Sequence, residues 1–214
     1  MGKFGKTVFY PPLEEKINVW SHGIGAVFSF IALVFLSLKG IRDGNTLHII
    51  SYLIYGFSLI ILYLASTIYH NSKNEIARNR LNVFDHASIY VLIAGTYTPF
   101  SLIVLEGKVG WIIFGVIWSF AIVGIVLKLF FTGKFKILST VMYVLMGWLM
   151  VFAIKPMMNN LSVDGLWWLL IGGISYTVGA VLYSIKSIKF NHAIFHIFVL
   201  IGSIAHFISI YFYI

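Results

Sequence analysis

The feature that most constrains this chain is a series of seven apolar runs, each long enough to cross a membrane as a helix. A helix needs about 20 apolar residues to span the hydrocarbon core. Only 10% of the residues are charged and 60% are hydrophobic, whereas soluble globular proteins carry about 25% charged residues. The sequence therefore predicts an all-α integral membrane protein, a seven-transmembrane helix bundle that forms one domain over residues 1–214. The predicted spans are Asn18–Leu38, Leu47–Tyr69, Phe84–Leu105, Gly110–Phe130, Ile137–Ile154, Gly165–Ile185 and Ala193–Ile214.

Basic residues gather on one side of this predicted topology. Cytoplasmic loops of membrane proteins carry an excess of Lys and Arg. The side that holds the N-terminus has eleven of the 15 basic residues and the other side has four. We therefore predict an inside N-terminus, an outside C-terminus and a multi-pass protein in the plasma membrane. Loops and lipid headgroups then account for the net charge of +8, so no nucleic-acid partner is expected. The eleven are Lys3, Lys6, Lys16, Lys73, Arg78, Arg80, Lys128, Lys134, Lys136, Lys186 and Lys189, and the four are Lys39, Arg42, Lys108 and Lys155.

The ionisable residues inside the predicted spans are histidines and one aspartate, apart from Lys128 near a span end. An ionisable group in a membrane is costly and marks a candidate functional site. The chain has no cysteine, so a transition metal must be held by His, Asp or Glu. Two of the histidines are expected to lie apart from a site. His48 should make a headgroup or capping contact, and His206 should be buried and hydrogen-bonded. Four helices bring the others to one predicted depth, the cytoplasmic interface: His22, His70, Asp85, His86, His192 and His196.

The spacing of these residues predicts a zinc site. His192 and His196 are four residues apart, so one helix face presents both rings. Together with His70 they match a catalytic site with three protein ligands and a fourth position for water. Zinc lowers the pKa of such a water to about 7. Asp85 is expected to hold the water, act as general base or orient a histidine, and Ser66, one turn before His70, to hydrogen-bond the water or the developing oxyanion.

Each of these assignments has a structural alternative. Ser66 is a small residue of the kind that favours helix packing in membranes. Asp85 can cap the start of the third span, as carboxylates do at helix N-termini. The pair His192 and His196 can reach the interface as two independent polar groups.

Two further sets of residues are open in the same way. Glu15, Asn18 and His22 share one helix face, either as the interfacial start of a helix or as residues that support the metal ligands from behind. His86 follows Asp85 directly and so points about 100° away from it. It meets either the site or a neighbouring helix or headgroup.

Two prolines affect the predicted helices. Pro99 closes the run Gly95-Thr96-Tyr97-Thr98-Pro99 in the middle of a span, where it removes a backbone hydrogen bond and kinks the helix. Such a kink either opens a lipid-sized cavity or serves packing alone. The fifth span is expected to end before Pro156.

Five motifs in this order resemble one known family. They are Glu15-x2-Asn18-x3-His22-Gly23, Ser66-x3-His70, Asp85-His86, Gly95-Thr96-Tyr97-Thr98-Pro99 and His192-x3-His196. The chain resembles the hemolysin III family, which belongs with the progestin and adipoQ receptors (PAQR) in the CREST superfamily, together with the alkaline ceramidases. The resemblance covers the chain from Glu15 to the last span.

The resemblance implies a seven-helix bundle with an inside N-terminus and a zinc ion bound by His70, His192 and His196. It implies that Ser66 and Asp85 lie at the same site. It also implies metal-dependent hydrolysis of a lipid amide at the cytoplasmic leaflet, with membrane lipids as the partners. The substrate does not follow from the resemblance, and the sequence does not give the oligomeric state.

Three functions follow from these patterns. The first is a zinc-dependent lipid amide hydrolase. The second is a pore-forming or haemolytic protein, although the fourth, fifth and sixth spans show no charged stripe. The third is a sensor or regulator of membrane lipid state, in which zinc holds helices together without catalysis. Whether the chain is an enzyme therefore stays open at this point.

Overall fold

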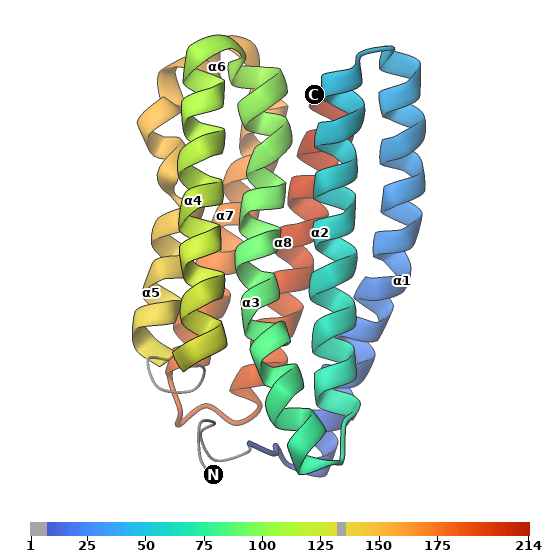
Figure 1. Ribbon diagram of the computed structural model, residues 1–214, viewed down its shortest axis with the longest axis vertical. Coiled ribbons are helices and arrows are strands. Elements are labelled where there is room, and N and C mark those ends of the chain that lie inside the picture. The colour runs from blue at the N-terminus through green and yellow to red at the C-terminus, as the bar shows by residue number, and fades with distance from the viewer. Residues whose placement is uncertain (1–7, 132–135) are drawn as a thin grey trace.

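The computed structural model describes residues 8–131 and 136–214, and every regular element within these ranges is helical. Seven helical segments are long and apolar enough to cross a membrane, which confirms the predicted fold class of a multi-pass membrane protein. They lie side by side along the long axis of the molecule (Figure 1). The helices are α1 (Pro12–Asp43), α2 (Thr46–Asn71), α3 (Glu75–Pro99), α4 (Gly107–Phe131), α5 (Lys136–Gly147), α6 (Ile154–Asn160), α7 (Val163–Ser184) and α8 (Asn191–Tyr213).

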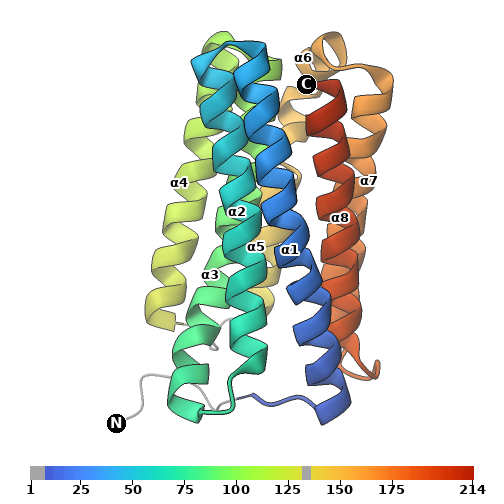
Figure 2. The same ribbon diagram turned by 90° about the vertical axis from the view of Figure 1, so that its right-hand side faces the viewer.

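The helices form a bundle in which the span made of α3 and the segment that follows it, Glu75–Leu105, is the most buried. Helices that follow one another along the chain pack together, α5 also contacts α7, and α1 contacts α8. Figure 2 shows α1 between α2 and α8. Large apolar side chains cover the outer faces of α1 and α4, as lipid contact requires. Examples are Val27, Phe28, Val34, Ile112 and Ile122.

One end of the bundle carries the candidate site, and we call it the N-terminal end. Here α1, α3 and α8 begin and α2 ends (Figure 1). The prediction that this end faces the cytoplasm rests on the loop charges. Three of those charges, Lys3, Lys6 and Lys134, lie outside the described residues.

Short capped turns join α1, α2 and α3. Gly44 ends α1 with φ of 66°, a left-handed conformation that favours glycine. The Asn45 side chain then accepts a hydrogen bond from Leu47 N at the start of α2. Asn74 does the same for Ala77 N at the start of α3. These caps satisfy backbone donors that helix starts leave unpaired.

The predicted end of the fifth span before Pro156 is wrong. The α-helix α5 stops at Gly147, a 3₁₀ helix follows over Leu149–Ala153, and α6 continues the span to Asn160. Because α6 starts anew at Ile154, Pro156 lies in its first turn, where the missing N–H has no intrahelical partner to lose. The span therefore continues past the proline.

The other helix irregularity lies at Pro99, where α3 gives way to a π-helix over Phe100–Leu105. π-helical turns are often found at functional sites. Tyr97 joins this region to the break in the fifth span, because its hydroxyl donates to Gly147 O at 2.8 Å and accepts from Met150 N at 2.9 Å. Tyr97 and Trp148, which lie just before the two irregular segments, line the cavity described below.

Candidate metal centre

Three histidine nitrogens meet at the N-terminal end of the bundle. His70 lies in the last turn of α2, and His192 and His196 lie in the first two turns of α8. The Nε2 atom of His192 is 3.0 Å from that of His70 and 3.0 Å from that of His196. All three side chains are buried, and their ligand atoms lie within 4.8 Å of one another. The structure thus brings together the three residues that the sequence predicts as ligands, in a cluster that can hold a metal ion.

The hydrogen bonds on the far side of two rings indicate where their lone pairs point. His70 Nδ1 lies 2.8 Å from Glu15 Oε2, and an ionised carboxylate only accepts, so Nδ1 carries the proton. Ser21 Oγ donates to Asn18 O and therefore accepts from His196 Nδ1. In the neutral tautomers that this network assigns, the Nε2 atoms of His70 and His196 both present lone pairs to the same point.

The donor set fits zinc. Zinc–nitrogen bonds of about 2.0–2.1 Å in tetrahedral geometry place two ligand nitrogens roughly 3.3 Å apart, close to the spacing seen here. His192 Nε2 can donate to only one of the two facing lone pairs, because a neutral imidazole has one donor. A cation bound to all three nitrogens removes this mismatch.

A buried arginine supports His70 through Glu15. Arg78, on α3, is 1% exposed. Its Nη2 pairs with Glu15 Oε1, while Glu15 Oε2 contacts His70. Its Nη1 also donates to the carbonyl oxygens of Tyr69 and His70, both at 3.1 Å, and of Ser72 at 3.0 Å. These carbonyls belong to the last turn of α2 and to its C-cap Ser72, where no helical N–H four residues further on is present to pair with them. Arg78 thus fixes both the end of α2 and the carboxylate that orients its histidine.

The segment before α1 reaches the third ligand. Tyr10 OH lies 3.0 Å from His192 Nδ1, and the two rings stack with centroids 4.5 Å apart. Tyr10 N donates to Glu15 Oε1 at 2.9 Å. Arg78 Nε donates to Val8 O at 2.9 Å, which ties this segment to α3. Burial raises the pKa of Tyr10 above its ordinary value, so the phenol stays neutral beside His192.

The predicted supporting residues on α1 contact two of the ligands. Asn18 Nδ2 lies 3.4 Å from His70 Nδ1. The His22 ring stacks on that of His196, with centroids 3.5 Å apart and 9° between the planes. Both His22 nitrogens are buried and hydrogen-bond to no described residue. His22 therefore packs against a ligand ring and does not hold it by a hydrogen bond.

Ser66, Asp85 and His86 lie in the wall of a cavity of about 140 Å³ that His192 and His196 also line. The Ser66 hydroxyl is buried and hydrogen-bonds to no described residue. Asp85 Oδ2 is 3.6 Å from His86 Nδ1, and His86 Nδ1 contacts Asn82 O at 3.0 Å. Asp85 is not among the three converging residues.

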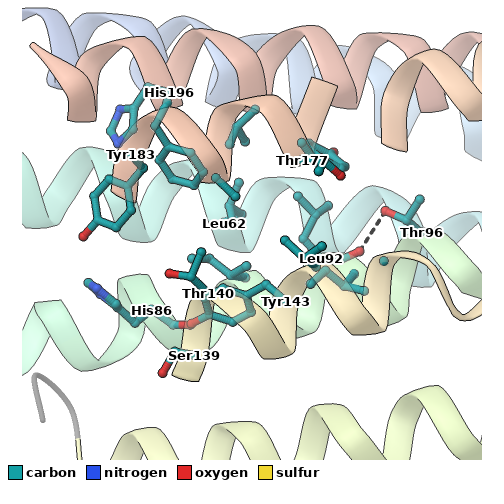
Figure 3. Close-up of a pocket in the computed structure, with 18 of the residues that line it drawn as sticks. Leu62, His86, Leu92, Thr96, Ser139, Thr140, Tyr143, Thr177, Tyr183 and His196 are labelled. Carbon is teal, nitrogen blue, oxygen red and sulfur yellow. Dashed lines mark hydrogen bonds between the residues drawn. The ribbon is translucent and has the colours of Figure 1, made fainter. Parts of the chain in front are cut away.

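The cavity runs along α8 from the histidine cluster into the bundle. A cavity needs about 10–15 Å³ to hold one water, so this cavity is roughly ten times larger than a single-water site. Figure 3 shows His196 and Tyr183 facing His86 and Thr140 across one part of it, with Thr177 and Thr96 further along. His206 lines the far part and its Nε2 contacts Leu169 O at 3.2 Å, whereas His48 lies apart, at Asp43.

Three residues of this network were not identified from the sequence as site residues. Arg78 was counted only among the loop charges, and Tyr10 and Ser21 were not considered. For Arg78 the sequence offered one signal, its position in the short stretch between two apolar spans. Tyr10 and Ser21 become visible only when α1 and its preceding segment are placed against α8.

Comparison with known proteins identifies relatives over nearly the whole chain. Residues 11–207 match the family model described as "Haemolysin-III related". The hemolysin-3 homolog of Bacillus subtilis (strain 168) is 46% identical over 200 residues, covering 94% of each chain. Hemolysin-3 of Bacillus cereus is 44% identical over 201 residues, covering 94% of this chain and 92% of its own.

A more distant relative is the human monocyte to macrophage differentiation factor. It is 29% identical over 170 residues, covering 75% of this chain and 68% of its own. This similarity supports the wider superfamily that the five motifs predict. No solved structure matches the chain.

Proposed function

The chain belongs to the haemolysin-III-related family, and we propose that it is a zinc-dependent hydrolase of a lipid amide, acting at the cytoplasmic leaflet of the plasma membrane. The observation that carries this proposal is the convergence of three histidine Nε2 atoms beside a cavity whose lining surface is mostly apolar. A buried polar centre next to an apolar cavity suits a substrate with a polar head and an acyl chain.

His70, His192 and His196 would hold the zinc ion. When bound, zinc supplies Lewis acidity and a nucleophile from water at neutral pH. Glu15 keeps His70 in the tautomer whose Nε2 faces the centre, and Ser21 does the same for His196.

The two remaining polar residues of the cavity wall take the reacting groups. Asp85 is the general base that takes a proton from water and returns it to the leaving nitrogen, so that one residue balances both steps. The Ser66 hydroxyl is buried and makes no hydrogen bond to a described residue. It donates to the carbonyl oxygen of the substrate amide as negative charge develops on that oxygen. The apolar part of the cavity, lined by Leu62, Leu92 and Val199, holds the acyl chain.

A His70→Ala variant tests this proposal. We expect it to insert normally, to lose the metal and to release no fatty acid from N-acyl lipids, because two imidazoles do not complete the site. The matched control is His48→Ala, which removes a histidine at the other end of the same helix. Unchanged lipid turnover in a correctly inserted His70→Ala protein would count decisively against the proposal.

A non-catalytic sensor held together by zinc is the second candidate. The observation in its favour is that the three ligands join the ends of α2 and α8, so a metal there also braces the bundle. The two functions differ in one measurement. Asp85→Asn should keep the metal and lose turnover in a hydrolase, whereas in a sensor no turnover is present to lose. Dye release from vesicles tests haemolytic activity, which the names of the two Bacillus relatives suggest.

A further inference from the structure

One lysine of the bundle faces the cavity. Lys128 lies one turn before the end of α4 and is 5% exposed. Its Nζ donates to Ser139 Oγ on α5 at 2.6 Å and lies 5.9 Å from the centre of the Tyr143 ring. Lysines near span ends normally extend toward the interface and water, as the exposed Lys73 does at the same end of the bundle. Lys128 instead turns inward.

The surroundings of Lys128 make the cavity polar at one end. Lys128, Ser139 and Thr140 line it from α4 and α5, across from the histidine cluster on α8. Figure 3 shows Ser139 and Thr140 at the same end of the pocket as His86 and His196. Further along α8 the cavity reaches His206, ten residues beyond His196, or about 15 Å. A cationic end and a long remainder whose surface is mostly apolar match an amphiphile.

The charge of this end favours an anion. An ammonium group within a membrane is costly and marks a binding or transport site by default. Residues 107–163, which include α4, α5 and α6, contain no Asp or Glu. Asp85 lines the same cavity from α3, and it repels an anion on its own side. The favoured position for an anionic group is therefore against α4 and α5.

We propose that Lys128, Ser139 and Thr140 bind the anionic head group, carboxylate or phosphate, of an acyl amphiphile whose chain fills the cavity. The anion accepts from the Lys128 ammonium and the two hydroxyl groups, the bond to be cut lies at the histidine cluster, and the chain extends toward His206. Combined with the proposed hydrolase, on which this part rests, the substrate class is an N-acyl lipid with an acidic head. Anion binding itself does not depend on hydrolysis.

Two matched ligands test the subsite. N-dodecanoylglycine and N-dodecanoylglycinamide share the chain and the amide bond and differ only in the charge of the head. Their binding to the full-length protein is measured in phosphatidylcholine nanodiscs by calorimetry. We expect the acid to bind about 10-fold more tightly than the amide, the effect of one hydrogen bond to a charged group. A second pair, dodecyl phosphate and dodecanol, distinguishes phosphate from carboxylate as the preferred anion.

Three variants locate the preference. Lys128→Met should bind both acylglycine ligands equally, Lys128→Arg should keep the preference for the acid, and the exposed control Lys73→Met should keep it fully. If Lys128→Met does not fold, the wild-type ratio and Ser139→Ala, with an expected loss of about threefold, remain decisive. The proposal is overturned if wild type binds the neutral ligand as tightly in both pairs, or if folded Lys128→Met keeps the preference.

The same experiment separates this subsite from the proposed reaction. Charge-selective binding without fatty acid release from either acylglycine ligand supports the subsite and contradicts the hydrolase. Equal release from both ligands, with equal affinity, supports the hydrolase and contradicts the subsite.

Discussion

Two clusters built from similar residues lie at opposite ends of α2. At the N-terminal end, His70 Nδ1 lies 2.8 Å from Glu15 Oε2, and Arg78 pairs with the same carboxylate. At the other end, His48 Nδ1 lies 3.2 Å from Asp43 Oδ2 and Lys39 Nζ lies 3.9 Å from it. Both are a histidine, a carboxylate and a cation, with the carboxylate on α1 and the histidine on α2.

The difference between the clusters lies in burial and in what the free ring nitrogen meets. The side chains of His48 and Asp43 are 24% and 21% exposed, whereas that of His70 is 0% exposed. His70 Nε2 faces two further imidazoles from α8, whereas the ring next to His48 is that of Tyr52, with centroids 6.1 Å apart. The same residue types therefore form a cluster that can hold a metal ion only at the end where α8 adds two more histidines.

Removing Arg78 should have the largest effect on stability. In Arg78→Met the carbonyls of the α2 end and the Glu15 carboxylate lose a buried cation, and breaking a buried pair in this way costs about 3–5 kcal/mol. Reversible unfolding in mixed micelles measures the loss. The control is Arg80→Met at an exposed position of the same helix, expected to change stability by less than about 0.5 kcal/mol. Equal stability of the two variants would remove Arg78 from the network.

Neutralising the carboxylate at each end should separate the clusters by metal affinity. Glu15→Gln keeps the side-chain shape but weakens the orientation of His70, and loss of such a supporting partner lowers metal affinity about 10- to 100-fold. Asp43→Asn is the matched change at the other end and should leave the affinity unaltered. Competition with a zinc chelator measures both, and an unchanged affinity in Glu15→Gln is the contrary result.

Tyr10 should contribute less than Glu15. Tyr10→Phe keeps the stacking on His192 and removes the hydroxyl at 3.0 Å from Nδ1. We expect metal affinity to fall by about threefold to 10-fold, the value of one hydrogen bond. The chelator competition is the readout, with Tyr10→Leu, which also removes the stacking, as the comparison. A metal affinity that is lower in Tyr10→Phe than in Tyr10→Leu would contradict this assignment of the hydroxyl and the stacking.

The smallest effect should come from His48→Ala. Partly exposed ion pairs contribute about 0–1 kcal/mol, so unfolding and metal content should both match wild type. High salt should further reduce any difference, because it screens exposed charges. A loss of metal in His48→Ala would show that the two ends of α2 are coupled.

The sequence was informative where a residue's role depends on helix position alone. Apolar run length predicted the seven spans, and the four-residue spacing of His192 and His196 with His70 at the same depth predicted the cluster. The predicted end of the fifth span was wrong. A proline ends a helix that runs through it, but α6 begins only two residues before Pro156, so the proline falls in its first turn.

Residues whose role depends on the direction of a side chain escaped prediction. Arg78 and Lys128 both read as ordinary basic residues at the cytoplasmic side, yet both are buried, 1% and 5% exposed. A long basic side chain can turn either outward to water or inward to the bundle. Its direction depends on the helix ends and the cavity around it, which the sequence does not show. Tyr10 escaped because its partner, His192, lies 182 residues away.

Metal content tests the central claim most directly. Wild type and His192→Ala/His196→Ala are purified in detergent without added metal and analysed by elemental mass spectrometry. The account predicts about one zinc per wild-type chain and none in the double variant, with both proteins folded. A folded wild-type protein that carries no transition metal, and takes up none from excess zinc, would contradict it.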